Sequence, residues 1–204
     1  MGDEEMEQAR RARNVAVFLF EQVEPLDFAG PFEVFLSGSN EGQDFNVYTV
    51  AANNCPVKAL GGLSINPAYT IADCPKPDIL VIPGGWGSRK EMNNDTITNW
   101  IRGISNDIEV ILSVCTGALI LAKANLLDGL KVTTNRLAIH ELREIVPAST
   151  EIVEAARYVD NGKIILSAGV SAGMDAALYV IEKLLGIDRA IEAATIMEYD
   201  WRRD

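Results

Sequence analysis

The sequence predicts an α/β fold in which a mostly parallel sheet is covered by helices on both faces. Short apolar runs, typical of strands buried on both sides, alternate with segments of helical character. The connections between them are short, and parallel neighbours require crossover helices. With 204 residues, of which 48% are apolar, the chain is long enough to bury roughly 70% of the surface that its unfolded form exposes. We therefore expect one compact domain.

The expected domain spans residues 14–204, because no internal repeat, low-complexity tract or linker interrupts this range. Residues 1–13 are polar and charged and lack apolar periodicity, so we expect them to form a mobile leader. The leader also has no apolar stretch of the kind that a secretory signal peptide contains.

The first part of the chain predicts two buried strands with a helix between them. VAVFLF (Val15–Phe20) is a continuous apolar run, and FNVYTVA (Phe45–Ala51) supplies the second strand. The helix is expected at Asp27–Ser37. After the second strand, paired glycines between apolar residues within Val57–Asn66 indicate a hairpin that lies outside the main layer.

The middle of the chain repeats the strand and helix pattern twice. Ile79–Ile82 is a buried strand, and the glycines of Pro83–Gly87 require a tight turn after it. Thr96–Ile104 has the spacing of an amphipathic helix. Glu109–Val114 is the next strand, and Leu119–Leu126 has helical character up to a glycine that favours a helix end.

The last third of the chain predicts a hairpin among further helices. Two strands, Ile152–Val159 and Lys163–Ser167, are joined by an Asp-Asn-Gly sequence that favours a tight turn. One short strand and three helices complete the pattern, at Lys131–Thr134, Leu137–Ile145, Ser171–Leu185 and Asp188–Tyr199.

Composition argues against several classes of protein. The formal charge is −11 and no stretch is rich in Lys or Arg, so phosphate backbones and anionic membrane surfaces are repelled and we expect neither as a partner. The longest uncharged stretch that resembles a membrane span, Val110–Ala122, is shorter than the ~20 residues that span a bilayer. A soluble cytoplasmic protein is expected.

The few cysteines and the single histidine also restrict the chemistry. Cys55, Cys74 and Cys115 cannot all pair within one chain, and they lack the spacing of a zinc site. His140 alone cannot form a multi-histidine metal centre. We expect no metal and no cofactor.

Cys115 is the strongest candidate for a chemical role. Ligands of such sheets bind beyond the carboxyl ends of the strands, and Cys115 follows a strand directly. The order strand, Cys-Thr-Gly-Ala, helix is that of a nucleophile elbow, a sharp turn that lifts one side chain above the sheet. A helix N-terminus there is expected to hold the thiol pKa below the ~8.5 of free cysteine. The alternative is a buried core cysteine.

The turn after Ile79–Ile82 also lies at a strand end. One interpretation is a flexible connection. The other is that the backbone N–H groups of Gly84 and Gly85 form an oxyanion pocket beside the thiolate. Trp86 either borders this pocket or covers apolar surface.

Several other polar residues are also candidates for a role in the site or in the fold. Asp27 is either a helix cap or an acid that hydrogen-bonds the sulfur and moves protons, with Glu24 as an alternative acid. Thr116 either caps the next helix or places its hydroxyl and N–H in the pocket. His140 fits a half-exposed helical residue better than a base, and Asp175 fits packing support.

Several motifs follow one another along the chain. They are VEPLDFAGPFEVF (Val23–Phe35), PGG (Pro83–Gly85), SVCTGALILAKANLLDG (Ser113–Gly129), VTTN (Val132–Asn135), GVSAGMDAAL (Gly169–Leu178) and EYD (Glu198–Asp200). In this order they resemble the ThiJ/PfpI superfamily, which has the class I glutamine amidotransferase-like fold. Its isocyanide hydratase-like branch carries LD-x-x-GP near the N-terminus and C-T-G at the elbow, and the sensor half of a group of AraC-type regulators is also similar.

This resemblance implies a flavodoxin-like three-layer sandwich and a homodimer. It also implies that Cys115 is the nucleophile and Asp27 the acidic partner beside it. Thr116 stands where protease-like relatives carry a histidine, which argues against peptidase or amidase activity. Asn135 stands where many relatives of this branch have a histidine after the paired threonines, so that imidazole is absent here.

Three functions remain open for a small-molecule substrate. The first is hydration of an isonitrile to an N-substituted formamide by a cofactor-free enzyme that uses the Cys115 thiolate, with Asp27 moving protons. The second is a non-enzymatic sensor or stress-response protein in which the same cysteine is modified or oxidised. The third is glyoxalase-like or deglycase activity on small carbonyl compounds.

Overall fold

The computed structural model describes residues 11–203, in which seven strands form the main sheet. Their order across the sheet is β10-β11-β7-β6-β1-β2-β5. All neighbours are parallel except β10 and β11, which form an antiparallel pair at one edge. The strands are β1 (Arg13–Leu19), β2 (Phe45–Ala51), β5 (Tyr69–Thr70), β6 (Ile79–Ile82), β7 (Val110–Val114), β10 (Tyr158–Asp160) and β11 (Ile164–Ser167).

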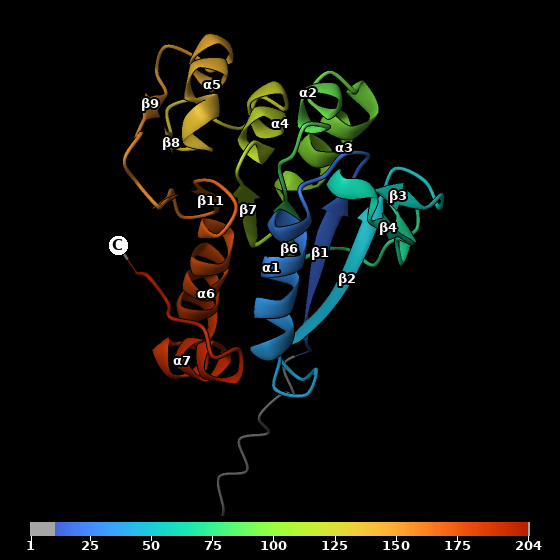
Figure 1. The fold of residues 1–204 in the computed structure, drawn as a ribbon, viewed down its shortest axis with the longest axis vertical. Coiled ribbons are helices and arrows are strands. Elements are labelled where there is room, and N and C mark those ends of the chain that lie inside the picture. Colours follow the sequence, from blue (N-terminus) through green and yellow to red (C-terminus); the bar gives the residue numbers. More distant parts are fainter. Residues whose placement is uncertain (1–10, 204) are drawn as a thin grey trace, which may run out of the picture.

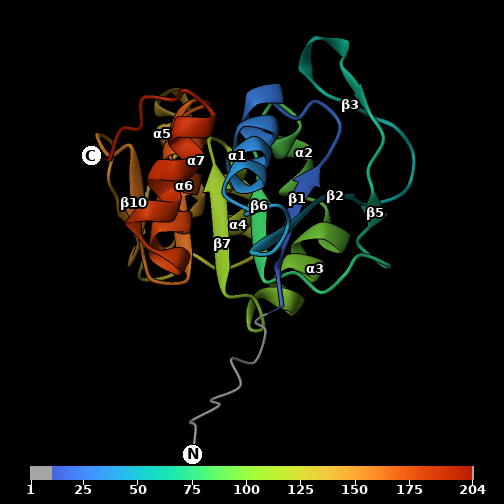
Figure 2. The ribbon, with the colours of Figure 1, turned by 90° about the horizontal axis from the view of Figure 1, so that it is seen from below.

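Helices cover both faces of this sheet (Figures 1 and 2). On one face, α1 (Pro25–Ser37), α6 (Ala172–Leu185) and α7 (Ile187–Ile196) pack against one another. The other face carries four helices, α2 (Ser88–Glu91), α3 (Asp95–Ser105), α4 (Gly117–Lys123) and α5 (Ile139–Ile145). This is the predicted flavodoxin-like three-layer sandwich with a mostly parallel sheet.

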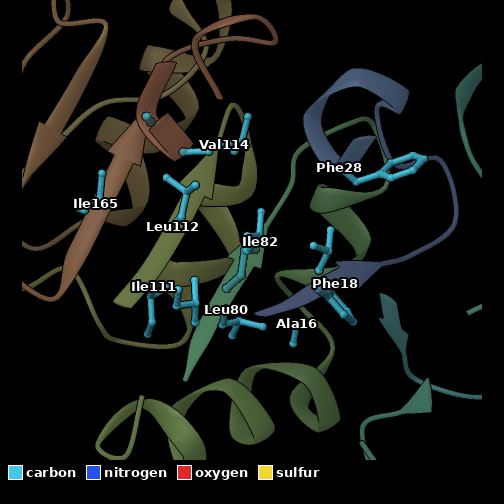
Figure 3. Packing of buried hydrophobic residues seen from close by; sticks show 14 of the residues in the cluster. Ala16, Phe18, Phe28, Leu80, Ile82, Ile111, Leu112, Val114 and Ile165 are labelled. Carbon is cyan, nitrogen blue, oxygen red and sulfur yellow. The ribbon is translucent and has the colours of Figure 1, made fainter. Parts of the chain in front are cut away.

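The core lies on the central strands because they are covered from both sides. Every residue of β6 and β7 is buried. Ala16, Leu80 and Ile111 are in register on β1, β6 and β7 and lie side by side (Figure 3). Three adjacent parallel strands therefore end at the same edge, where β6 and β7 lead into the turns that form the site.

Two small sheets lie outside the main one. β3 (Val57–Lys58) and β4 (Ser64–Ile65) form an antiparallel hairpin around a 3₁₀ turn at Leu60–Gly62, and Figure 1 shows this hairpin beyond the sheet edge, as predicted. The second pairs β8 (Lys131–Val132) with β9 (Glu151–Ile152) in parallel.

The prediction of one strand over Ile152–Val159 was wrong. β9 and β10 are separate strands that join different sheets. Between them the chain turns so that Arg157 reaches the buried carboxylate of Asp175. The predicted hairpin between β10 and β11 is confirmed, and Gly162 occupies its left-handed position.

Other differences concern short elements and helix ends. The sequence pattern missed β5 and α2, because neither is long enough to show a period. α4 begins two residues earlier than expected and ends at Lys123, since Asn125 adopts a left-handed φ of 58°. A 3₁₀ turn over Arg136–Ala138 precedes α5, so the expected Leu137–Ile145 helix is split.

The expected boundary between leader and domain was also misplaced. β1 begins at Arg13, which is only 6% exposed. Its guanidinium forms an ion pair with Glu109 at 2.7 Å. Arg11 forms a second pair, with Asp78, at 2.7 Å. The last residues of the expected leader are thus part of the fold, while the predicted mobility of residues 1–10 lies outside the described residues.

The described helices are short for membrane-spanning segments. The longest, α6, has 14 residues, whereas a span needs ~20. No helix within residues 11–203 is long and apolar enough to cross a membrane.

Arg13→Gln should lower the free energy of unfolding by about 1–2 kcal/mol, because a buried donor loses hydrogen bonds to a charged partner. This loss of free energy is at the low end of the range for a hydrogen bond to a charged group, because the Glu109 side chain is 42% exposed and stays solvated. Urea denaturation measures it. Arg11→Gln is the matched control: Arg11 is 68% exposed, so its pair should be worth less than about 1 kcal/mol. Equal losses in both variants would contradict the role given to Arg13.

Candidate active site

Cys115 occupies the sharp turn between β7 and α4. Its φ is +54°, a strained value for a non-glycine residue, and its side chain is 6% exposed. Gly117 allows the turn to pack closely, because a Cβ there would lie 2.1 Å from the carbonyl oxygen of Ile82. The predicted nucleophile elbow is therefore present, and it holds the sulfur above the carboxyl end of the sheet.

Asp27 lies in the first turn of α1 and is completely buried. Its Oδ2 accepts a hydrogen bond of 2.9 Å from the N–H of Gly84. Its Oδ1 has no hydrogen-bond partner within the described chain, and the Cys115 side chain is near enough to lower the pKa of the carboxyl group. The cap position of α1 belongs to Glu24, which makes no side-chain cap bond. The interpretation of Asp27 as a helix cap is wrong.

Burial controls the protonation of this pair. It raises the pKa of Asp27 to about 7, against the opposing hydrogen bonds from Gly84 and Cys115. Burial, followed by the charge of Asp27, raises the pKa of Cys115 to about 11. The expectation of a lowered thiol pKa was therefore wrong, because desolvation outweighs the donors at the helix N-terminus. Between about pH 7 and about pH 11 the two groups together hold one proton.

Three donors face the sulfur and oppose this rise of its pKa. They are the backbone N–H groups of Val170 and Thr116 and the side chain of Asn135. Val170 has a φ of +41°, an outlier for a β-branched residue. Asn135 Oδ1 accepts a hydrogen bond from the N–H of Leu137, which leaves its amide nitrogen for the sulfur. The Asn135 amide is thus a donor on the side of the sulfur formed by the segment before α5.

The turn after β6 supports the pair, but its amides are already occupied. The N–H of Gly84 bonds to Asp27, and the N–H of Gly85 bonds to Thr116 Oγ1 at 3.0 Å. The prediction that these two amides form an oxyanion pocket was therefore wrong. Glycine is required at position 84, where a Cβ would lie 2.5 Å from the Thr116 nitrogen and 2.9 Å from Asp27 Oδ2.

The hydroxyl of Thr116 joins the elbow to this turn. Besides accepting from the N–H of Gly85, it lies 3.2 Å from the Gly85 carbonyl oxygen and 3.0 Å from the Ser88 hydroxyl. It does not cap α4. The hydroxyl therefore has a positioning contact, and only the backbone N–H of Thr116 faces the sulfur. Thr134 adds support by donating to the Cys115 carbonyl oxygen at 2.7 Å.

A cavity of about 330 Å³ opens over Cys115. Trp86 is 68% exposed at its border and stacks with the guanidinium of Arg89, which also pairs with Glu141 at 2.6 Å. The sequence interpretation gave no site role to several lining residues, because they come from distant segments. These residues are Leu60, Arg89, Leu137, Ala138, Glu141 and Val170. His140, considered from the sequence as a helical residue rather than a base, also lines the cavity.

The remaining candidates lie elsewhere. Cys55 is exposed and Cys74 partly buried, and neither lines the cavity of Cys115. Glu24 does line it, but Asp27 is the carboxyl group beside the sulfur. No three His, Cys, Asp or Glu residues among positions 11–203 are grouped as ligands for a metal ion. Cys115 is therefore the thiol that a small molecule in this cavity meets.

Comparison with known proteins agrees with this arrangement. Residues 13–183 match the model of the DJ-1/PfpI family. The chain belongs to the DJ-1/PfpI family. It is 34% identical to an isonitrile hydratase of Pseudomonas putida over 92% of this chain and 79% of that protein. It is 27% identical to the HTH-type transcriptional regulator CdhR of Pseudomonas aeruginosa, of which it covers 48%.

Solved structures of the DJ-1/PfpI family show the same fold. A ThiJ/PfpI family protein from Pseudomonas syringae aligns with a TM-score of 0.84 and 28% identity, over 99% of this chain and 81% of that one. Drosophila melanogaster DJ-1beta aligns with a TM-score of 0.82 and 22% identity, over 93% of this chain and all of that one. The fold predicted from the motifs is thus confirmed.

Thr116→Val should lower the free energy of unfolding by about 1–3 kcal/mol, because the buried Gly85 N–H loses its acceptor. Thr116→Ser retains the hydroxyl and should cost only about 0.8 kcal/mol for the lost methyl group. Urea denaturation of both variants measures the difference. If valine were as stable as serine, the link between elbow and turn would have no energetic importance.

The rate of Cys115 alkylation by iodoacetamide should rise as the pH passes about 7. Over this range the Cys115–Asp27 pair changes from two protons to one, and a form with a thiolate beside protonated Asp27 can then be populated. In Asp27→Asn this step should disappear. A single rise should remain below about pH 11, since the Asp27 charge no longer raises the thiol pKa. Peptide mass spectrometry follows the rate, with Cys55 as internal control. A step near pH 7 that survives in Asp27→Asn would refute the coupling.

Proposed function

We propose that this DJ-1/PfpI family member is a cofactor-free isonitrile hydratase. The observation that carries the proposal is the buried Cys115–Asp27 pair, which holds one proton between about pH 7 and about pH 11 at the base of a small cavity. Such a pair offers a nucleophile and a proton to the same atom. The 34% identity to an isonitrile hydratase supports this choice of substrate class.

In the first step, the Cys115 thiolate forms a bond to the terminal carbon of the isonitrile. The same carbon takes the proton of Asp27, so the product is a thioimidate, in which a C=N double bond joins the carbon to the substrate nitrogen. Asp27 is then a carboxylate. Its contact with the Cys115 side chain places the acid next to the sulfur that bonds to the substrate carbon.

In the second step, water adds to the thioimidate carbon. One proton of the water moves to the substrate nitrogen and the other returns to Asp27, while the carbon–sulfur bond breaks. The water oxygen becomes the formyl oxygen of the N-substituted formamide, and the Cys115 thiolate is restored. One isonitrile and one water are consumed for each formamide, with no redox change.

The donors around the sulfur suit both steps. The N–H groups of Thr116 and Val170 and the Asn135 amide face the atom that leaves in the second step, where they stabilise the departing thiolate. The cavity wall is largely apolar at Leu60 and Trp86, which fits a small organic substrate. Thr116 acts here through its backbone N–H, while its hydroxyl holds the turn.

A second candidate is a non-enzymatic sensor with a reactive cysteine, since the chain is 27% identical to part of a transcriptional regulator. Intact-protein mass spectrometry separates the two proposals: an enzyme turns over isonitrile and returns to its original mass, whereas a sensor keeps a stoichiometric adduct at Cys115. Exposure to small aldehydes in the same experiment tests the glyoxalase or deglycase alternative. We also propose a cytoplasmic homodimer, for which light scattering and cell fractionation are the tests.

Asp27→Asn should reduce isonitrile turnover by about 10²–10⁴-fold, because the amide cannot deliver or recover the proton. Formamide release measured by chromatography gives kcat. Glu24→Gln is the matched control, since Glu24 lines the cavity without being the acid beside the sulfur, and it should retain far more activity. A melting curve for each variant checks the fold. Equal turnover in Asp27→Asn and the parent protein would remove Asp27 from the mechanism.

A further inference from the structure

A second cavity, of about 650 Å³, adjoins the cavity over Cys115. Its wall contains the guanidinium-bearing residues Arg136, Arg157 and Arg202, which come from three distant segments. No acidic residue lines it. We refer to this space as the arginine cavity. Three arginines around one cavity contrast with a chain whose formal charge is −11.

Two of these arginines form no ion pair within the part of the chain that the structure describes. Arg157 pairs with the buried Asp175, whose Oδ1 also accepts from the Tyr199 hydroxyl at 3.1 Å and the Arg202 backbone N–H at 2.9 Å. These bonds fix the end of the chain against the cavity. The side chains of Arg136 and Arg202 form no ion pair within residues 11–203. The cavity therefore has a local positive charge.

The arginine cavity lies next to the cavity over Cys115. Asn135 and Val170 line both cavities, and the same two residues act on the Cys115 thiol as donors that lower its pKa. A substituent that passes Asn135 and Val170 from a molecule bonded to the sulfur would reach the neighbouring cavity. Its far end would lie among the arginines.

We propose that the arginine cavity binds an oxyanion on the molecule that reacts at Cys115, so that the substrates are isonitriles with a carboxylate or phosphate-type group. The choice of isonitrile rests on the proposed function. Guanidinium groups bind carboxylate and phosphate oxygens through paired N–H donors, and both of the unpaired arginines can turn toward one such group. Arg136 and Arg202 are thus specificity-determining residues.

Matched isonitriles test this proposal. 4-Isocyanobutanoate, its neutral amide, and 3-isocyanopropylphosphonate differ mainly in the terminal group, and the two anions separate a carboxylate from a phosphate-type ligand. The anions should have kcat/KM values about tenfold above that of the amide, because bonds to charged groups are the stronger ones. In the double variant Arg136→Gln/Arg202→Gln the ratio of anion to amide should fall to about one. The preference should also decline with added salt, since the cavity is open.

The control variant is Arg203→Gln, which removes one arginine charge from the position next to Arg202. Arg203 pairs with Glu182 at 2.5 Å and lies outside the arginine cavity, so the anion preference should persist. Melting curves confirm that each variant folds. Equal kcat/KM for anions and amide in the parent protein, or an equal loss of preference in Arg203→Gln, would overturn the proposal.

A second readout does not depend on isonitrile turnover. Iodoacetamides with a carboxylate-terminated or an amide-terminated N-alkyl tail label Cys115 by the same chemistry. The anionic reagent should react about tenfold faster, and the double variant should abolish this difference. If no isonitrile is turned over and the labelling preference is present, the hydratase proposal fails and the anion site stands. If both reagents label at one rate, the anion site fails whatever the turnover.

Discussion

The hydrogen bond from the Gly84 N–H to the buried carboxyl group of Asp27 is the contact on which the site depends. It joins the first turn of α1 to the turn after β6. The Thr116 hydroxyl then joins that turn, through the N–H of Gly85, to the elbow after β7. Three segments separated in sequence are thus connected by two buried bonds, and an unsatisfied group at either would be costly. This arrangement places an acid beside Cys115.

Burial gives the pair its chemical character. A helix N-terminus alone would favour a free thiolate, but the desolvation of both groups raises both pKa values, and the pair retains one proton between about pH 7 and about pH 11. The strained φ values of Cys115 and Val170 belong to the same arrangement, since they direct the sulfur and an N–H group toward each other. The strain is supported by the packed strands below, where β7 is buried along its length.

The two cavities beyond the carboxyl edge of the sheet differ in their charge. The cavity over Cys115 is bordered by apolar side chains and by the Arg89–Glu141 pair, in which the charges offset each other. The adjoining arginine cavity has charge without such compensation. Asp175 connects this second region to the core, because it is completely buried and holds Arg157 together with the end of the chain. Its predicted role as packing support is consistent with these bonds.

The sequence alone determined the layered fold, the position of the elbow at Cys115 and the choice of Asp27 as a candidate acid, since buried strands, glycine-rich turns and short motifs are local signals. It could not determine the direction of the pKa shifts or the use of the Gly84 and Gly85 amides. Those depend on how deeply groups are buried and on which acceptor each donor meets, and both follow from packing between distant segments. Asn135 and Val170 lie in motifs that the sequence shows, but their convergence on one sulfur, like that of the three arginines on the second cavity, was decided by tertiary structure alone, because it brings together segments far apart in the chain.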